Sequence, residues 1–357
     1  MATYNFSAGP SSLPKVVADR VAASFRDFRG TGIGIAEHSH RGPAFEGLLR
    51  ETETLVRRLA DVPTDYAVMF MPGGGSLQFY GVPMNFLVPG RTADYCLTGH
   101  WAKKAYDDAV AIGQTHVACS SEATGHDRIP QAVTTSPNPV YLHYCTNNTI
   151  YGTQWQAPPD VPSHVPLVAD ISSDMFSRPP RIAEHAMVYA CAQKNLGIAG
   201  VTLVIARRDF IATGRRDLPA MLQYRTFDEH GSMPNTPPTF AIYVMYEMLT
   251  WIAEQGGVAG LQARAAQKSS MLYDFIDATP FYRGHAEPAS RSKMNVTFRC
   301  PTPELDAKLL AQASAAGFAY LAGHRSTGGM RASIYNAMPV ETVGALVQFL
   351  ADFARAQ

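Results

Sequence analysis

The sequence predicts an α/β protein with a mostly parallel seven-stranded sheet in a large domain, plus a smaller α+β domain. Between residues 66 and 206, seven short apolar runs alternate with helical patterns, as in parallel α/β sheets. The runs are apolar at both alternating positions, which is typical of strands buried on both faces. A chain of 357 residues with 46% hydrophobic and 17% charged residues has the composition and length of a two-domain globular protein.

The first fifteen residues are rich in turn formers, and a helix is predicted to follow. Val17, Val21, Phe25 and Phe28 recur at helical spacing, and the glycines of GTGIG (30–34, after Arg29) then end the pattern. A second amphipathic helix is expected over 45–59. GTGIG is not a dinucleotide fingerprint, because Ile35 occupies the position where the third glycine of that motif belongs and no strand precedes it.

The seven strands are expected at YAVMFM (66–71), ADYCLT (93–98), THVAC (115–119), PVYLHYC (139–145), VPLVAD (165–170), AMVYAC (186–191) and VTLVIA (201–206). Helical patterns follow over 239–255 and up to residue 278. Strands KMNVTFRC and MRASIY then alternate with helices that begin at Pro303 and Pro339. We therefore predict a large domain over 16–258 and a small domain made of 1–15 and 259–357.

Charge and apolar patterning exclude several functional classes. Thirty basic residues balance thirty acidic ones without a basic run, which argues against nucleic-acid binding. The longest apolar stretch, Leu196–Ala206, has eleven residues, whereas a membrane span needs ~18. MATYNFSAGP lacks the features of a signal peptide. The expectation is a cytoplasmic protein without membrane or nucleic-acid partners.

No metal site is expected. The five cysteines contain no C-x-x-C pair, which argues against zinc and against a disulfide framework. The EHSH stretch carries His38 and His40, but no third ligand is evident nearby.

Candidate reactive groups follow five of the predicted strands. They are GGGS at 73–76, His100–Trp101, Asn147–Thr149, Asp170 and Lys194. The carboxyl ends of parallel strands meet at one edge of a sheet, where ligands of open α/β sheets bind. The coincidence of five groups therefore carries more weight than any one of them.

Lys194 is the most informative of these residues. Only seven of the thirty basic residues are lysines, and this one lies between two apolar runs. A lysine is rarely buried without a partner, so a solvated loop is the ordinary reading. An amine that sheds its proton in an apolar setting is, however, what imine chemistry requires. We expect burial to bring Lys194 close to neutral.

The other groups each have a structural and a functional reading. GGGS before a helical stretch is either a tight turn or a phosphate cradle at a helix N-terminus. Trp101 is either core or a stacking platform, and Asp170 is either a turn cap or the counter-charge of a protonated ring nitrogen. Thr149 could join turn chemistry or bond a ring substituent. Together with a lysine, these functions describe pyridoxal phosphate.

Anion-binding residues are predicted outside these strands. His40 and Arg41 lie in SHRG, and GHRSTGGMRASIYN carries His324, Arg325 and Arg331. Most isolated arginines are solvated or paired at the surface. Arg331 lies inside an apolar run, where a bidentate carboxylate would be its natural partner.

The motifs FSAGP, SHRG, GHWA, DISSDMFSRP, AQKN, NTPPTF and GHRSTGGMRASIYNA resemble those of the phosphoserine aminotransferase family, at family-like spacing over nearly the whole chain. This is a class V, fold-type I family that depends on pyridoxal phosphate. The resemblance implies that Lys194 forms the internal aldimine, Asp170 pairs with the pyridine nitrogen, Trp101 stacks on the ring and Thr149 contacts it. It also implies a homodimer with active sites at the subunit interface.

The resemblance further assigns the two kinds of anion. The cofactor phosphate would be surrounded by Gly75, Ser76, Ser172 and Gln193, joined across the dimer interface by Asn235 and Thr236. Arg331 would bind the substrate α-carboxylate, and the distal phosphate or carboxylate would meet His40, Arg41, His324 and Arg325. Ser76 and Leu77 stand where many bacterial members have Arg-Gly, which removes one cation from the distal pocket.

The implied reaction is ping-pong transfer of the amino group from L-glutamate to 3-phosphohydroxypyruvate through pyridoxamine phosphate. The products are O-phospho-L-serine and 2-oxoglutarate, in serine biosynthesis, and a role with 4-phosphohydroxythreonine in vitamin B6 synthesis is also implied. Two alternatives stay open. One is another aminotransferase or a lyase acting on a small amino acid, and the other is a nucleotide-binding or non-catalytic α/β module.

Overall fold

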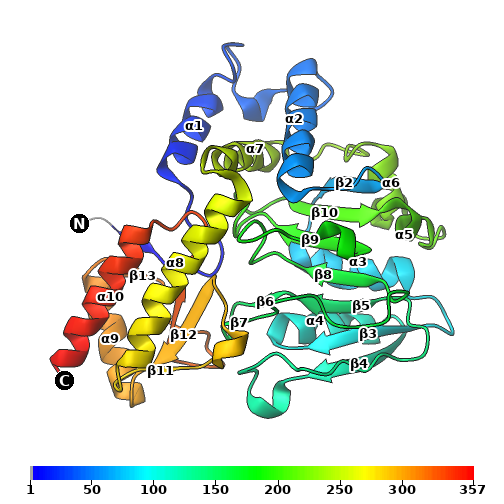
Figure 1. The fold of residues 1–357 in the computed structure, drawn as a ribbon. Coiled ribbons are helices and arrows are strands. Elements are labelled where there is room, and N and C mark those ends of the chain that lie inside the picture. Colours follow the sequence, from blue (N-terminus) through cyan, green and yellow to red (C-terminus); the bar gives the residue numbers. More distant parts are fainter. Residues whose placement is uncertain (1–2) are drawn as a thin grey trace.

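The centre of the molecule is a sheet of seven strands. In a computed structural model that describes residues 3–357, they are β2 (Tyr66–Met71), β3 (Thr92–Leu97), β4 (Gln114–Ser120), β5 (Leu142–Cys145), β8 (Leu167–Asp170), β9 (Met187–Cys191) and β10 (Thr202–Arg207). Their order across the sheet is β2-β10-β9-β8-β5-β3-β4 (Figure 1). Each strand overlaps one predicted run, so the seven-stranded sheet is confirmed.

One strand of this sheet runs against the others. β10 is antiparallel to both β2 and β9, while the remaining pairs are parallel, so the sheet is mostly parallel as predicted. Thr202, the first residue of β10, lies opposite both Met71 and Cys191. The carboxyl ends of β2 and β9 therefore reach the same edge of the sheet.

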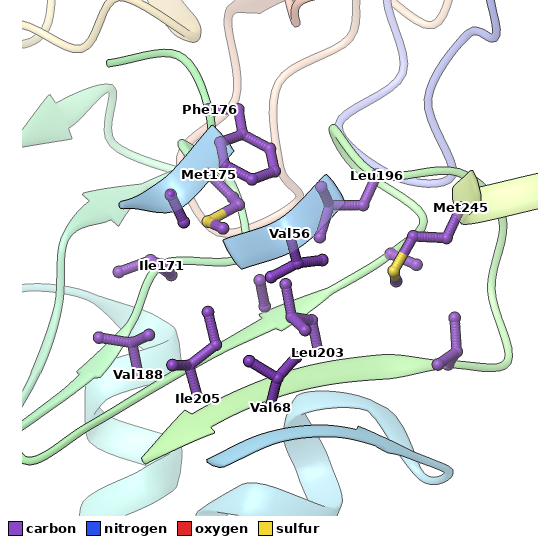
Figure 2. Close-up of a cluster of buried hydrophobic side chains, with 14 of the residues drawn as sticks. Val56, Val68, Ile171, Met175, Phe176, Val188, Leu196, Leu203, Ile205 and Met245 are labelled. Carbon is purple, nitrogen blue, oxygen red and sulfur yellow. The ribbon is translucent and has the colours of Figure 1, made fainter. Parts of the chain in front are cut away.

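Helices cover both faces of the sheet. The first face packs against α1 (Lys15–Arg26), α2 (Pro43–Ala60) and α7 (Thr239–Glu254), and the second against α3 (Gly74–Phe86), α4 (His100–Val110), α5 (Arg208–Ala212) and α6 (Tyr224–Glu229). Successive strand residues point to opposite faces. Leu203 thus joins the first core and Val204 the second. Figure 2 shows Leu203 and Ile205 in the first core, with Val56 of α2 and Met245 of α7.

A separate core lies in a second unit, whose helices and strands are to the left of the sheet in Figure 1. It is built from α8 (Gly257–Ala278), α9 (Pro303–Ala315), α10 (Val340–Arg355) and a three-stranded antiparallel sheet of β11 (Arg283–Gly284), β12 (Asn295–Arg299) and β14 (Met330–Ser333). This second unit combines helices with an antiparallel sheet, as an α+β unit does. Helix α8 places Leu261 in the first core of the large sheet and Leu272 in this separate, third core. Because one helix contributes to both, the domain boundary near residue 258 stays a prediction.

The N-terminal segment crosses between the two units. β1 (Tyr4–Asn5) pairs in parallel with β13 (Phe318–Ala319), and Phe6 is fully buried in the third core. The chain then passes the edge of the large sheet before α1 begins at Lys15. The remaining short elements are the hairpin β6 (Asn147–Asn148) and β7 (Thr153–Gln154) and the 3-10 turns η1 (Ile35–Glu37), η2 (Glu122–Thr124), η3 (Ile182–Glu184), η4 (Ala220–Leu222) and η5 (Pro288–Ser290).

Within residues 3–357, no helix combines the length and the apolar character needed to cross a membrane.

Candidate active site

A cavity of about 290 Å³ lies at the carboxyl edge of the large sheet. Most of the residues predicted to be functional line it together. These are Gly75, Ser76, Trp101, Thr149, Asp170, Ser172, Gln193, Lys194, His324 and Arg331. Strand β8 ends at Asp170 and β9 ends three residues before Lys194. The expectation that strand ends bring these groups to one edge is therefore confirmed by their positions.

The N-terminus of α3 forms one end of the cavity. Gly73 caps the helix with φ +92°, a left-handed conformation that glycine adopts at little cost. In the next turn, the amide N–H of Gly75 donates to Cys191 Sγ at 2.9 Å. The hydroxyl of Ser172 accepts from Cys191 N at 3.0 Å. The dipole of α3 favours an anion at this end.

Asp170 and Lys194 form the electrostatic centre of the cavity. Asp170 Oδ1 accepts from Ser172 N at 2.9 Å. Burial raises the pKa of Asp170 above its ordinary value, against the opposing effects of Lys194 and Ser172. Burial lowers the pKa of Lys194, but the opposing effects of Tyr335, Asp170, Cys191 and Cys145 together outweigh it, and the net shift is upward.

The expectation that burial alone makes Lys194 nearly neutral is therefore wrong for this arrangement of residues. The reason is that the amine shares its buried site with anionic or ionisable oxygens, whose field favours the charged form. A cation held against Asp170 would cancel part of that field and lower the pKa of Lys194.

Trp101 lies across the cavity from Lys194. The lysine Nζ is 5.9 Å from the centroid of the indole ring. Trp101 Nε1 donates to Thr149 Oγ1 at 3.3 Å, which fixes the orientation of the ring. A flat ring bound beside the indole would therefore meet the lysine amine as well.

Arg331 brings a cation from the small unit to the cavity. Its Nη1 donates to the carbonyl of Thr149 at 3.3 Å, whereas its buried Nε has no hydrogen-bond partner among the described residues. Burial lowers the pKa of this guanidinium. An unsatisfied buried N–H of an arginine is costly, and a carboxylate bound in the cavity would satisfy it.

Five predicted residues do not line this cavity. Arg325 is exposed next to His324, and the other four lie on two loops of the large unit. His40 and Arg41 lie between η1 and α2, and Asn235 and Thr236 lie between α6 and α7. None of these four residues lines the cavity of its own chain.

Five lining residues were not predicted as site residues. They are Ala8, Gly9, Phe79, Ile150 and Cys191. Ala8 and Gly9 belong to the FSAGP motif, so the motif was a usable signal although its residues carry no reactive group. Among residues 3–357, no cluster of three or more histidine, cysteine, aspartate or glutamate side chains is arranged to hold a metal ion.

Known proteins share this architecture. The sequence model of the family described as "Aminotransferase class-V" matches residues 3–346 of this chain. The phosphoserine aminotransferase of Herpetosiphon aurantiacus is 49% identical over 360 aligned residues, which cover all of both chains. The chain belongs to the phosphoserine aminotransferase family of class V aminotransferases.

Solved structures of this family agree in fold. The phosphoserine aminotransferase of Bacillus circulans subsp. alkalophilus is 48% identical, with a TM-score of 0.97 over 99% of each chain. That of Trichomonas vaginalis, described as bound to PLP, is 36% identical, with a TM-score of 0.93 over 98% of this chain and 99% of that one. The fold-type I architecture expected from the sequence is thereby confirmed, and the chain is a class V aminotransferase.

Proposed function

We propose that this aminotransferase uses pyridoxal 5'-phosphate to transfer the amino group of L-glutamate to 3-phosphohydroxypyruvate, giving O-phospho-L-serine and 2-oxoglutarate. The observation that carries the proposal is that Lys194, Asp170, the N-terminus of α3 and Arg331 converge on one cavity. The names of the full-length relatives support the choice of substrates.

The residues present fit this cofactor. The amides at the start of α3, with Ser76, Ser172 and Gln193, would hold its phosphate. Asp170 would hold its ring nitrogen, Trp101 would cover one face and Thr149 would meet a ring substituent. Pyridoxal phosphate, when bound, supplies an electron sink for the substrate carbon that loses a proton.

Lys194 is the group of this chain that can move that proton. Its amine lies in a buried cavity and must be neutral to accept a proton from the substrate α-carbon. Asp170 raises the pKa of Lys194, so a ring cation held by Asp170 would bring the amine closer to neutrality. The Asp170 carboxylate would thereby hold the ring nitrogen of the cofactor and also influence the pKa of Lys194.

The substrate anions would be bound by residues from the small unit and from a second subunit. Arg331 has the unsatisfied N–H that an α-carboxylate would accept from. His324 lines the same cavity and Arg325 follows it, so we place the distal phosphate or γ-carboxylate there, with His40 and Arg41. Ser76 offers a hydroxyl but no charge, so this distal pocket relies on the remaining cations.

Replacing Arg331 by Ala tests the carboxylate assignment. We expect kcat/KM to fall roughly 10²–10³-fold for glutamate and for the keto acid, because losing one partner of a buried charged hydrogen bond costs about 2–5 kcal/mol. Steady-state kinetics with each substrate measure the change. Arg299, exposed at the end of β12, provides the matched control Arg299→Ala. An unchanged kcat/KM for glutamate in Arg331→Ala would remove Arg331 from this role.

We also propose a homodimer whose partner subunit supplies His40, Arg41, Asn235 and Thr236 to each cavity. Phe25 (56% exposed) and Ile33 (46% exposed) leave apolar surface near these loops, and Phe25 contacts Phe240, four residues after Thr236. Apolar side chains exposed together suit a subunit interface.

A cytoplasmic location is also proposed, supported by five cysteines that are all free.

Mixed dimers test whether the site is shared. One subunit carries Lys194→Ala and the other Arg41→Ala, with different affinity tags so that only the mixed dimer is purified. Each single-variant dimer lacks a complete site, whereas the mixed dimer has one intact site and should show about half of the wild-type activity. If Arg41 served the cavity of its own chain, the mixed dimer would have no intact site and no activity.

The substrate assignment is tested by comparing amino acceptors. The purified chain, saturated with pyridoxal phosphate, is assayed with glutamate and 3-phosphohydroxypyruvate, and in parallel with alanine plus glyoxylate and with cysteine. Phosphohydroxypyruvate should have the highest kcat/KM. A higher value for alanine plus glyoxylate, or breakdown of cysteine, would favour a different class V reaction. Protein that took up no cofactor would instead favour a non-catalytic module.

A further inference from the structure

The loop that carries Lys194 is held by the small unit as well as by the large one. Asn195, the next residue, is 1% exposed. Its Oδ1 accepts from the backbone N–H of Asn336 at 3.0 Å, and its Nδ2 donates to the carbonyl of Ser173 at 3.3 Å. Asn336 follows β14, the strand that carries Arg331. The lysine loop is therefore tied directly to that strand.

The N-terminal segment makes a second connection to the same loop. The backbone N–H of Ser11 donates to the carbonyl of Gln193 at 2.9 Å, and the Ser11 hydroxyl donates to the carbonyl of Lys194. Between these anchors and the small unit, Gly9 lies beside the lysine stem. A Cβ atom on Gly9 would be 3.6 Å from Lys194 Cγ and 3.7 Å from Cε. The segment therefore forms a wall against the lysine side chain.

Tyr335 fixes the other end of this wall. Its hydroxyl donates to the carbonyl of Ala8 at 2.7 Å, and the tyrosine is 2% exposed. Asn295 Nδ2 reaches the same hydroxyl at 3.5 Å and donates to Ser333 Oγ at 3.0 Å, so neighbouring polar groups restrain the phenol. Tyr335 comes four residues after Arg331. A shift of Arg331 on β14 would thus be passed to Ala8 and to the wall.

We propose that Tyr335 and Ser11 are positioning residues that hold residues 8–11 against Lys194 and tie the place of its amine to the strand carrying Arg331. Tyr335 acts through the carbonyl of Ala8, and Ser11 acts through the backbone of the lysine loop. The inference rests on the proposed roles of Lys194 and Arg331. By this proposal, the FSAGPSS segment fixes the position of the Lys194 amine relative to the carboxylate that Arg331 would bind.

Tyr335→Phe tests the proposal, because it keeps the buried ring and removes only the hydroxyl. We expect kcat to fall about three- to tenfold, the effect of one lost hydrogen bond, with the KM for glutamate changed by less than about twofold. The pH titration of the bound cofactor's absorbance should also move to lower pH, since Tyr335 favours the charged form of the lysine nitrogen.

Ser11→Ala should move the same titration, whereas Ser12→Ala is the matched control. Ser12 lies in the same segment, but its hydroxyl donates to the carbonyl of Asn5 and not to the lysine loop. Thermal melts accompany each variant. The proposal is overturned if Tyr335→Phe leaves both kcat and the titration unchanged, if it lowers only the melting temperature, or if Ser12→Ala shifts the titration as much as Ser11→Ala.

The titration needs the bound cofactor but no substrate. A shifted titration in a chain that fails to transaminate phosphohydroxypyruvate would therefore uphold the positioning role and reject the proposed substrate. Conversely, normal turnover with an unshifted titration would reject the positioning role alone.

Discussion

Lys194→Ala should lower kcat about 10⁴-fold or more, because the same amine holds the cofactor and moves the proton at the substrate α-carbon. The variant should also lose the covalent attachment of the cofactor. Borohydride reduction followed by mass spectrometry of the digested chain measures this attachment directly. In the wild type, the added mass should be found on the peptide that contains Lys194.

Lys15→Ala is the matched lysine control. Lys15 lies at the start of α1, is largely exposed and pairs with Asp19, so its loss should change neither turnover nor labelling. Circular dichroism of both variants checks that the fold is kept. A Lys194→Ala chain that still carried the reduced cofactor would show that another amine forms the attachment, and the assignment of Lys194 would then be wrong.

Asp170→Asn should lower kcat roughly 10²–10⁴-fold while the cofactor stays attached to Lys194. Asparagine keeps the size of the side chain but cannot neutralise a ring cation, and leaving a buried charge without its partner costs about 3–5 kcal/mol. The amide also no longer raises the pKa of Lys194. Stopped-flow measurement of the half-reaction with glutamate separates this chemical effect from substrate binding.

Asp94→Asn is the control for burial of a carboxylate. Asp94 is buried in β3 and accepts from Ser136, but it does not line the cavity. Its replacement should affect stability without changing the half-reaction of the folded protein. Asp170→Asn with a kcat within tenfold of the wild type would show that Asp170 is a structural turn residue, the reading its bond from Ser172 N also permits.

The sequence predicted the parts of the site that follow strands. Asp170 and Lys194 were found because each comes at or just after an apolar run, and the carboxyl ends of parallel strands meet at one edge. Arg331 was found because a cation inside an apolar run needs a partner. These inferences need only local patterning and the rule for parallel sheets.

Other features depend on residues that are far apart in the chain. Tyr335 contributes to the upward pKa shift of Lys194, and local patterning does not bring this tyrosine near the lysine. Ala8 and Gly9 reach the cavity only because Phe6 is anchored in the core of the small unit. Cys191 ends a predicted strand, and its thiol also accepts from the Gly75 N–H at the start of α3. Apolar periodicity does not encode such contacts.

The reversed direction of β10 affects how firmly the Lys194 loop is held at the edge of the sheet. Because β10 pairs with β9 itself, the Lys194 loop connects two adjacent strands that are almost entirely buried. Its ends are joined by the bond from Ala192 N to the carbonyl of Val201 at 3.1 Å. Most catalytic loops can open locally at little free-energy cost. Here the pairing of β9 with β10 keeps the two ends of the loop together, so local opening of the loop would not by itself carry the lysine away from the sheet edge.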